Sequence, residues 1–240
     1  MASESPSLQV VGLSASYGNV PAVTDVSLEV RRGEIVTMIG ANGAGKSTVI
    51  KCVCGLLKPT AGSVRLFGED LTGLTPDRLV KKGLSVVPEG RRLFSAMTLK
   101  ENFELGAYTR NDPAAVRRDM ERVLTLFPDL RDRLSAIAGT FSGGQQQMVA
   151  VARALMSNPR VMLLDEPTIG LAPVVVERIS DLLLEIAKSG VDILIVEQNA
   201  EVALSIAHRA YILEGGRVIA EDDANALAQS EQVQKAYLGI

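Results

Sequence analysis

Short apolar runs alternate along the chain with segments of helical periodicity. Residues 33–39 form a mostly apolar run that ends at Gly40, and residues 161–164 and 191–196 are apolar almost throughout. Such runs are typical of parallel strands that are covered on both faces. Residues 174–188 carry apolar side chains at helical spacing and end before Gly190. The alternation predicts an α/β fold with a mostly parallel sheet.

Residues 93–159 show a different pattern, which predicts several consecutive helices. Thr98 and Glu101 have the spacing of a capping box, and Asp112-Pro113 pairs an N-cap residue with proline at the first helical position. The helix expected after Asp112 has an apolar stripe that runs from Val116 to Phe127. We interpret 93–159 as a helical subdomain inserted between strands of the core.

The remaining segments predict a small antiparallel sheet and one further helix. Residues 8–30 and 63–67 have the pattern of short strands joined by glycine turns, and Gly215-Gly216 lies between two apolar runs as in a β-hairpin. The apolar segment from Lys46 to about Leu57 reads as a helix.

The chain is thus predicted to form one domain over residues 7–240. Its core comprises 7–92 and 160–240 and includes the antiparallel part, whereas 93–159 is the helical subdomain. The polar residues 1–6 are expected to be a disordered N-terminus.

Composition excludes several classes of function. The 240 residues are 47% hydrophobic and 22% charged, with a net charge of −3, no Trp and 4% aromatic residues. These values argue against nucleic-acid binding. The two cysteines, Cys52 and Cys54, are too few for a disulfide framework or a zinc site. No apolar run approaches the roughly 20 residues that span a bilayer, and the start lacks a secretory signal. We therefore expect a soluble chain that reaches a membrane only through a partner.

A complete phosphate-binding motif follows the first predicted core strand and opens a helix. Its residues, all expected to contact nucleotide, are Gly40, Ala41, Asn42, Gly43, Ala44, Gly45, Lys46, Ser47 and Thr48. Glycines let backbone N–H groups wrap around phosphates at a helix N-terminus. Lys46 would reach the β- and γ-phosphates of ATP, and the Ser47 hydroxyl would ligate Mg²⁺. A glycine-rich turn with a chance lysine would not match every position in this context.

Two adjacent acids, Asp165 and Glu166, end the apolar run 161–164. A carboxylate at a strand end can support Mg²⁺, which we assign to Asp165. Glu166 can polarise a water for attack on the γ-phosphate. The pair is common by itself, and its combination with the phosphate loop is what predicts ATP hydrolysis.

A second glycine motif precedes the helical pattern that follows residue 145. Its residues are Ser142, Gly143, Gly144 and Gln145. Ser142 suits an N-cap, and the glycines expose N–H groups at the positive end of a helix. Read alone, the motif is either a second anion site or a flexible capped turn.

In combination, the three motifs resemble the ABC ATPase family, whose signature reads Leu-Ser-Gly-Gly-Gln; this chain has Phe141 at the first position. The resemblance covers essentially the whole chain. It implies a P-loop NTPase core with a small antiparallel β subdomain and an inserted helical subdomain. It also implies a dimer in which residues 142–145 of one subunit close over the ATP bound by the other.

The family pattern assigns roles to further positions. Tyr17 matches the aromatic residue that stacks on adenine. Glu89 stands where the family has a glutamine that touches Mg²⁺ and senses the membrane partner. Ala172 replaces an acid, and Gln198 replaces the switch histidine, where it could act in catalysis by binding a γ-phosphate oxygen. The only histidine, His208, lies ten residues further on and is expected to pack near a helix end.

These departures together resemble the LivF-type ATPase of branched-chain amino acid importers. That resemblance implies a second ATPase subunit in a heterodimer, two permease subunits and, indirectly, a periplasmic solute-binding protein. The form in isolation is left open between a monomer and a homodimer. It places the chain at the cytoplasmic face of the inner membrane. The alternatives are the ATPase of a urea or short-amide importer, a lipid exporter, and a soluble ABC ATPase that regulates without transport.

Overall fold

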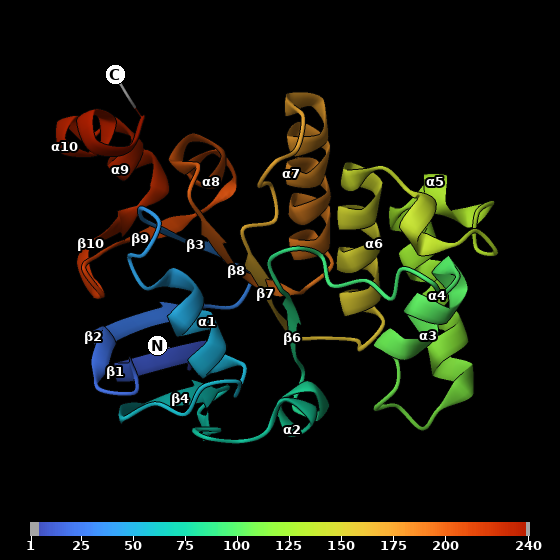
Figure 1. The fold of residues 1–240 in the computed structure, drawn as a ribbon, viewed down its shortest axis with the longest axis horizontal. Helices are drawn as coiled ribbons and strands as arrows, with labels where there is room; N and C mark the ends of the chain where they lie inside the picture. Colours follow the sequence, from blue (N-terminus) through green and yellow to red (C-terminus); the bar gives the residue numbers. More distant parts are fainter. Residues whose placement is uncertain (1–4, 239–240) are drawn as a thin grey trace.

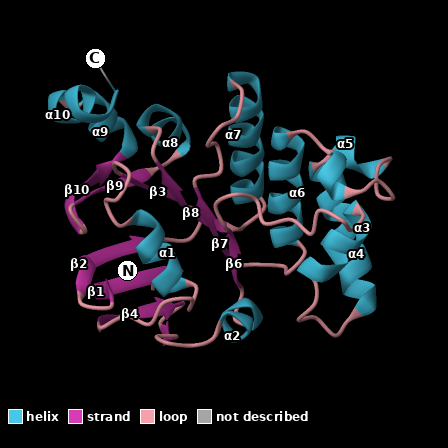
Figure 2. Ribbon diagram, viewed as in Figure 1, coloured by secondary structure: helices cyan, strands magenta, loops and turns pink. Residues whose placement is uncertain are grey.

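Two sheets organise the chain in the computed structural model, which describes residues 5–238 (Figures 1 and 2). One is antiparallel with the order β2-β1-β4-β5, and the other has the order β10-β9-β3-β8-β7-β6. In the second sheet the strands from β9 to β6 pair in parallel, and β10 pairs antiparallel with β9. The predicted fold class is confirmed.

The strands and helices follow each other along the chain in the alternation that the sequence predicts. The strands are β1 (Leu8–Tyr17), β2 (Val20–Val30), β3 (Ile35–Ile39), β4 (Ala61–Leu66), β5 (Glu69–Asp70), β6 (Leu84–Val87), β7 (Val161–Asp165), β8 (Asp192–Glu197), β9 (Arg209–Glu214) and β10 (Arg217–Asp223). The helices are α1 (Lys46–Val53), α2 (Pro76–Lys81), α3 (Leu99–Gly106), α4 (Pro113–Leu126), α5 (Pro128–Arg131), the 3-10 turn Ala138–Thr140, α6 (Gly143–Leu155), α7 (Pro173–Lys188), α8 (Ala200–Ile206), α9 (Ala224–Gln229), α10 (Glu231–Val233) and the π-helical turn Gln234–Leu238.

The parallel strands are buried on both faces, which explains their continuous apolar runs. Successive side chains of a strand point to opposite faces. In β7, Val161 and Leu163 join the apolar cluster shared with the antiparallel sheet, whereas Met162 and Leu164 join the cluster shared with α6 and α7. The sheet is therefore a middle layer, and its strand ends are held on both sides.

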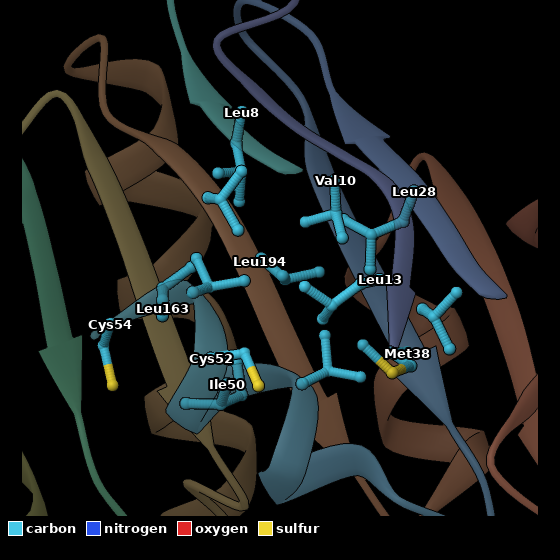
Figure 3. Packing of buried hydrophobic residues seen from close by; sticks show 14 of the residues in the cluster. Leu8, Val10, Leu13, Leu28, Met38, Ile50, Cys52, Cys54, Leu163 and Leu194 are labelled. Carbon is cyan, nitrogen blue, oxygen red and sulfur yellow. The ribbon is translucent and has the colours of Figure 1, made fainter. Parts of the chain in front are cut away.

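Helix α1 packs between the two sheets. Figure 3 shows Leu163 of β7 next to Ile50 and Cys52 of α1, in the buried cluster that also contains Leu8 and Leu13 of β1. Both Cys52 and Cys54 are free and buried. Because α1 follows the phosphate-binding motif directly, this packing fixes the position of that motif.

Helices α3 to α6 form the part of the molecule at the right of Figure 1. Thr98 caps α3 with both hydrogen bonds of the predicted capping box, and the Asp112 carboxylate accepts from the N–H groups of Ala114 and Ala115 at the start of α4. A second capping box joins Ser142 and Gln145 at the start of α6.

The helix expected from Lys46 to about Leu57 is shorter in the structure and ends at Val53. Gly55 has a φ of +73°, and a Cβ there would lie 2.2 Å from the carbonyl oxygen of Leu74. The chain therefore leaves the helix at a left-handed glycine, a common helix ending. Of the N-terminal residues predicted to be disordered, 1–4 lie outside the described residues. No helix within residues 5–238 is long and apolar enough to cross a membrane.

Candidate functional site

The phosphate-binding loop joins the end of β3 to the start of α1, in the context that its sequence predicts. Two of its glycines are required by close contacts. A Cβ at Gly40 would lie 2.3 Å from the carbonyl oxygen of Leu213, and one at Gly45, where φ is +107°, would lie 2.6 Å from Val23 Cγ1. The loop thus passes too close to β2 and β9 for larger residues.

Lys46 curls back over this loop and is 4% exposed. Its ammonium group donates hydrogen bonds to the carbonyl oxygens of Gly40 (2.8 Å) and Ala41 (3.3 Å). It also lies 3.3 Å from Glu166 Oε1. The structure therefore brings together the lysine and the acid that the sequence predicted for phosphate binding and water activation.

Ser47 and Asp165 also meet, although 118 residues separate them. The Ser47 hydroxyl donates to Asp165 Oδ1 at 3.1 Å. Burial raises the pKa of Asp165, the Ser47 hydrogen bond lowers it, and the nearby charges of Glu166 and Glu89 raise it again. A cation between these oxygens would relieve that repulsion.

The donor set fits Mg²⁺ that arrives with a nucleotide. Within residues 5–238 there is no group of three or more His, Cys, Asp or Glu side chains that could hold a metal. Mg²⁺ commonly uses one or two protein oxygens together with phosphates and water. Ser47 and Asp165 supply such a pair, and Glu89 and Ser47 line a common cavity.

Glu166 is placed by an unusual backbone conformation at the end of β7. Its φ is +48°, and its side chain is 8% exposed. Its N–H donates to the carbonyl oxygen of Val196 in β8 at 2.8 Å. Left-handed conformations in residues other than glycine cost energy and are found where the surrounding structure enforces them, often at functional sites.

A cavity of about 770 Å³ lies above the phosphate-binding loop. Tyr17 lines it, and the Lys51 ammonium lies 5.6 Å from the centre of the Tyr17 ring. The full lining comprises Tyr17, Pro21, Ala22, Asn42, Gly43, Gly45, Lys46, Ser47, Thr48, Glu89, Glu166, Ile169, Gly215 and Gly216. The cavity therefore contains most of the predicted site residues of the core.

The hairpin glycines were predicted as a turn but not as part of this cavity. Gly215 and Gly216 join β9 to β10, and a Cβ on Gly216 would lie 2.6 Å from the carbonyl oxygen of Ala22. The pair of glycines was the visible signal, and only the contact with β2 shows where the turn lies. Ile169, a further lining residue, was likewise not singled out.

The signature residues lie apart from this cavity, at the start of α6. Ser142 N donates to Gln145 Oε1, and Ser142 Oγ accepts from Gln145 N. A Cβ on Gly143 would lie 3.1 Å from an Arg91 nitrogen, and one on Gly144 would lie 2.5 Å from Val175 Cγ1. Within one chain, the structure does not bring residues 142–145 to the cavity that contains Lys46.

Gln198 lies in a second hollow, of about 1090 Å³, between α7 and α8. It is exposed and does not line the first cavity. Glu166 lines both hollows, and Glu197 lines the second. His208 lies just after α8, where its Nδ1 accepts from the N–H of Ile35. Through this hydrogen bond, His208 connects the start of β9 to the start of β3, and it lines neither hollow.

The geometry agrees with comparisons to known proteins. A family model described as "ABC transporter" matches residues 23–169. The chain belongs to the ABC transporter family. It is an ATPase of the ATP-binding cassette type, and the matched segment includes the phosphate-binding loop, residues 142–145 and the Asp165-Glu166 pair.

Three relatives align over nearly their whole length. A high-affinity branched-chain amino acid transport ATP-binding protein, BraG of Pseudomonas aeruginosa, is 48% identical over 95% of this chain and 97% of its own. A probable branched-chain amino acid transport ATP-binding protein, LivF of Archaeoglobus fulgidus, is 38% identical over 97% and 99%. The lipopolysaccharide export system ATP-binding protein LptB of Haemophilus influenzae is 34% identical over 97% of each.

Solved structures of cassettes share the fold. The ADP conformation of an ATP-binding cassette of an ABC transporter has a TM-score of 0.88 at 27% identity, covering 98% of this chain and all of that one. A dimeric bacterial ABC transporter cassette has a TM-score of 0.80 at 28% identity, covering 90% of this chain and 98% of that one.

Proposed function

We propose that this ABC ATPase powers an importer of branched-chain amino acids. The observation that supports hydrolysis is that Lys46, Ser47 and Glu166 line one cavity, where Ser47 also donates a hydrogen bond to Asp165. The choice of solute is supported by the 48% identity to BraG over 95% of the chain, against 34% to LptB. The urea and short-amide alternative has no comparable support among these relatives.

The residues of the chain divide the work of hydrolysis. Backbone N–H groups of residues 40–48 and the Lys46 ammonium hold the phosphates. Ser47 and Asp165, with Glu89 nearby, would hold Mg²⁺, which would supply positive charge close to the phosphates. Glu166 accepts a proton from the attacking water. Tyr17 provides a flat apolar face for adenine.

The site would be completed by a second subunit. Residues 142–145 are remote from the chain's own cavity, and their exposed helix N-terminus suits an anion. We infer that they close over ATP bound by a partner ATPase, in the manner of a dimeric cassette. Gln198, which shares a hollow with Glu166, would then hydrogen-bond the γ-phosphate.

Transport requires further chains. We propose that two permease subunits bind this ATPase at the cytoplasmic face of the inner membrane and that a periplasmic binding protein delivers the amino acid. The chain itself would be peripheral to the membrane.

The test uses membrane vesicles that contain the assembled transporter. We expect ATP-driven uptake of leucine with the wild-type chain and none with Lys46→Ala, while the same substitution at exposed Lys58 leaves uptake unchanged. Equal uptake by Lys46→Ala would refute the assignment of the site. Hydrolysis that responds to lipopolysaccharide export components, and not to leucine, would favour the lipid-exporter alternative.

Nucleotide binding can be measured separately from transport. Mg-ATP at about 100 times its dissociation constant should stabilise the wild-type fold by roughly 2.7 kcal/mol. Lys46→Ala should lose this stabilisation, and Lys58→Ala should keep it. A wild-type melting temperature that ignores Mg-ATP would contradict the proposal.

A further inference from the structure

Glu197 is a buried acid that none of the roles above requires. It is the last residue of β8, directly before Gln198, and is 2% exposed. A buried carboxylate is costly unless hydrogen bonds compensate its charge. Its partners therefore indicate what it does.

Two hydrogen bonds to the Glu197 carboxylate come from one residue, Thr168. Glu197 Oε1 accepts from the Thr168 backbone N–H at 3.0 Å and from the Thr168 hydroxyl at 2.7 Å. Hydrogen bonds to a charged acceptor are stronger than neutral ones. Glu197 thus fixes Thr168 by its main chain and its side chain at once.

Thr168 belongs to the turn that holds Glu166 in its left-handed conformation. The N–H of Glu166 donates to the carbonyl oxygen of Val196, and the N–H of Ile169 donates to the carbonyl oxygen of Glu166 at 3.3 Å. The last two residues of β8 therefore hold this turn at both ends, Val196 through its backbone and Glu197 through its side chain. A conformation that costs energy persists only when such contacts enforce it.

The two carboxylates are also close enough to affect each other. Burial raises the pKa of Glu197, the Thr168 hydrogen bonds lower it, and the charge of Glu166 raises it further. Glu197 lines the same hollow as Glu166 and Gln198. The end of β8 therefore joins the candidate base to the candidate switch residue.

We propose that Glu197 is a positioning residue for ATP hydrolysis. Through Thr168 it orients the Glu166 carboxylate and keeps it in the hollow that Gln198 also lines. The inference rests on the proposed hydrolytic role of Glu166. Glu197 itself transfers no proton, because its work is to accept two hydrogen bonds. An oxygen that accepts hydrogen bonds, rather than a negative charge, is what the position needs.

The test measures ATPase turnover and ATP affinity in the complex whose partner ATPase carries an inactivated site. Glu197→Ala should lower kcat roughly ten- to a hundredfold, the scale of lost hydrogen bonds to a charged group, with the dissociation constant for ATP nearly unchanged. Glu197→Gln keeps an acceptor oxygen and should retain most of kcat. Thr168→Val removes only the hydroxyl and should give an intermediate loss.

Asp192, at the opposite end of the same strand, provides the matched control. It is also a buried acid, and its Oδ1 accepts from the N–H of Gly33 at 2.6 Å. Asp192→Ala should reduce stability without lowering kcat per folded protein. If Glu197→Ala, like Asp192→Ala, lowers the measured ATPase rate only in proportion to the loss of folded protein, the role of Glu197 is structural alone and the proposal fails.

The remaining outcomes also decide the matter. A Glu197→Gln variant as slow as Glu197→Ala would make the charge essential and overturn a pure positioning role. Should Glu197→Ala not fold, an unchanged kcat in Thr168→Val would overturn the proposal equally well. A wild-type complex without turnover would instead contradict the proposed function, so the two failures are distinguishable.

Discussion

Glu166 combines a carboxylate with a backbone conformation that suits glycine better. A left-handed φ outside glycine costs on the order of 1–3 kcal/mol. A glycine at position 166 would adopt this conformation without the cost, but it would have no carboxylate. The strain is therefore a consequence of having an acid at this position. The hydrogen bond to Val196 and the contacts of Glu197 with Thr168 compensate for it.

The first prediction concerns this acid. Glu166→Gln keeps the size of the side chain and removes the base, so turnover in the assembled transporter should fall roughly 10²–10⁴-fold. ATP binding should persist, because the loop and Lys46 are unchanged. Glu185→Gln, on the exposed face of α7, is the control and should behave as wild type. Full turnover with Glu166→Gln would exclude Glu166 as the base.

The second prediction concerns pH and Cys52. Burial, and then the charge of Cys54, raise the pKa of Cys52 from 9.0 to about 11. Between these values the unfolded chain has lost the thiol proton while the folded chain keeps it, so stability falls as pH rises. Urea unfolding between pH 8 and 11 should therefore show a steeper decline for the wild type than for Cys52→Ala. Equal slopes would show that Cys52 does not titrate differently on folding.

At the scale of elements, α3 and α6 begin with the same capping box but at different places. The box of α3 joins Thr98 and Glu101, and that of α6 joins Ser142 and Gln145. Thr98 lies away from the proposed nucleotide contacts, whereas Ser142 belongs to them. The two helices thus offer a matched pair for separating capping from nucleotide contact.

The third prediction uses this pair. Thr98→Ala and Ser142→Ala should each cost about 1 kcal/mol of stability, because each removes one cap. Only Ser142→Ala should also reduce turnover of the assembled complex. The measurements are denaturant unfolding and ATPase rate per folded protein. A loss of turnover in both variants would trace the effect to helix stability instead.

Some elements follow directly from the sequence, and others depend on contacts that no local pattern contains. The strands β3, β7 and β8 can be recognised in the sequence as apolar runs because both of their faces are buried. The end of α1 cannot be recognised in this way, because it depends on the close contact of Gly55 with Leu74. Motif spacing likewise predicts that Lys46 and Glu166 act together.

The contact of Glu197 with Thr168 was not predicted, since 29 residues separate the two. It depends on the register in which β7 and β8 pair, where Asp165 lies opposite Val196. The same holds for Gly216, whose place in the cavity above the phosphate-binding loop depends on how the β9–β10 hairpin meets β2. For both contacts, the sequence shows which residue types are present, whereas the pairing of strands determines which of them come into contact.

At the scale of the whole molecule, Arg153 connects the helical subdomain to the segment after Glu89. From α6 its guanidinium donates to the carbonyl oxygens of Arg92 at 2.7 Å and Arg91 at 3.2 Å. Gly90, Arg91 and Arg92 all have positive φ. The Arg153 side chain thus holds residues 90–92 against α6, the helix that begins after Ser142. These residues directly follow Glu89, which lines the first cavity.

The fourth prediction tests this connection. Arg153→Lys keeps the charge but cannot reproduce a two-pronged guanidinium contact. In vesicles we expect fewer amino acids transported per ATP hydrolysed, with ATP affinity nearly unchanged. Arg122→Lys, on α4, is the control and should transport normally. A comparable fall in ATP affinity would place Arg153 with the nucleotide site rather than with the coupling of the two parts.

Because Lys46 forms an ion pair with Glu166, an anion that binds Lys46 must compete with the Glu166 carboxylate. The lysine ammonium already has a carboxylate at 3.3 Å and a carbonyl oxygen at 2.8 Å, so an incoming anion must displace an internal one. Orthophosphate can engage only a few donors of the loop. A triphosphate engages many N–H groups at once and also draws Lys46 away from the acid. We therefore expect the pair to favour ligands with several phosphates, such as nucleoside triphosphates, over small anions.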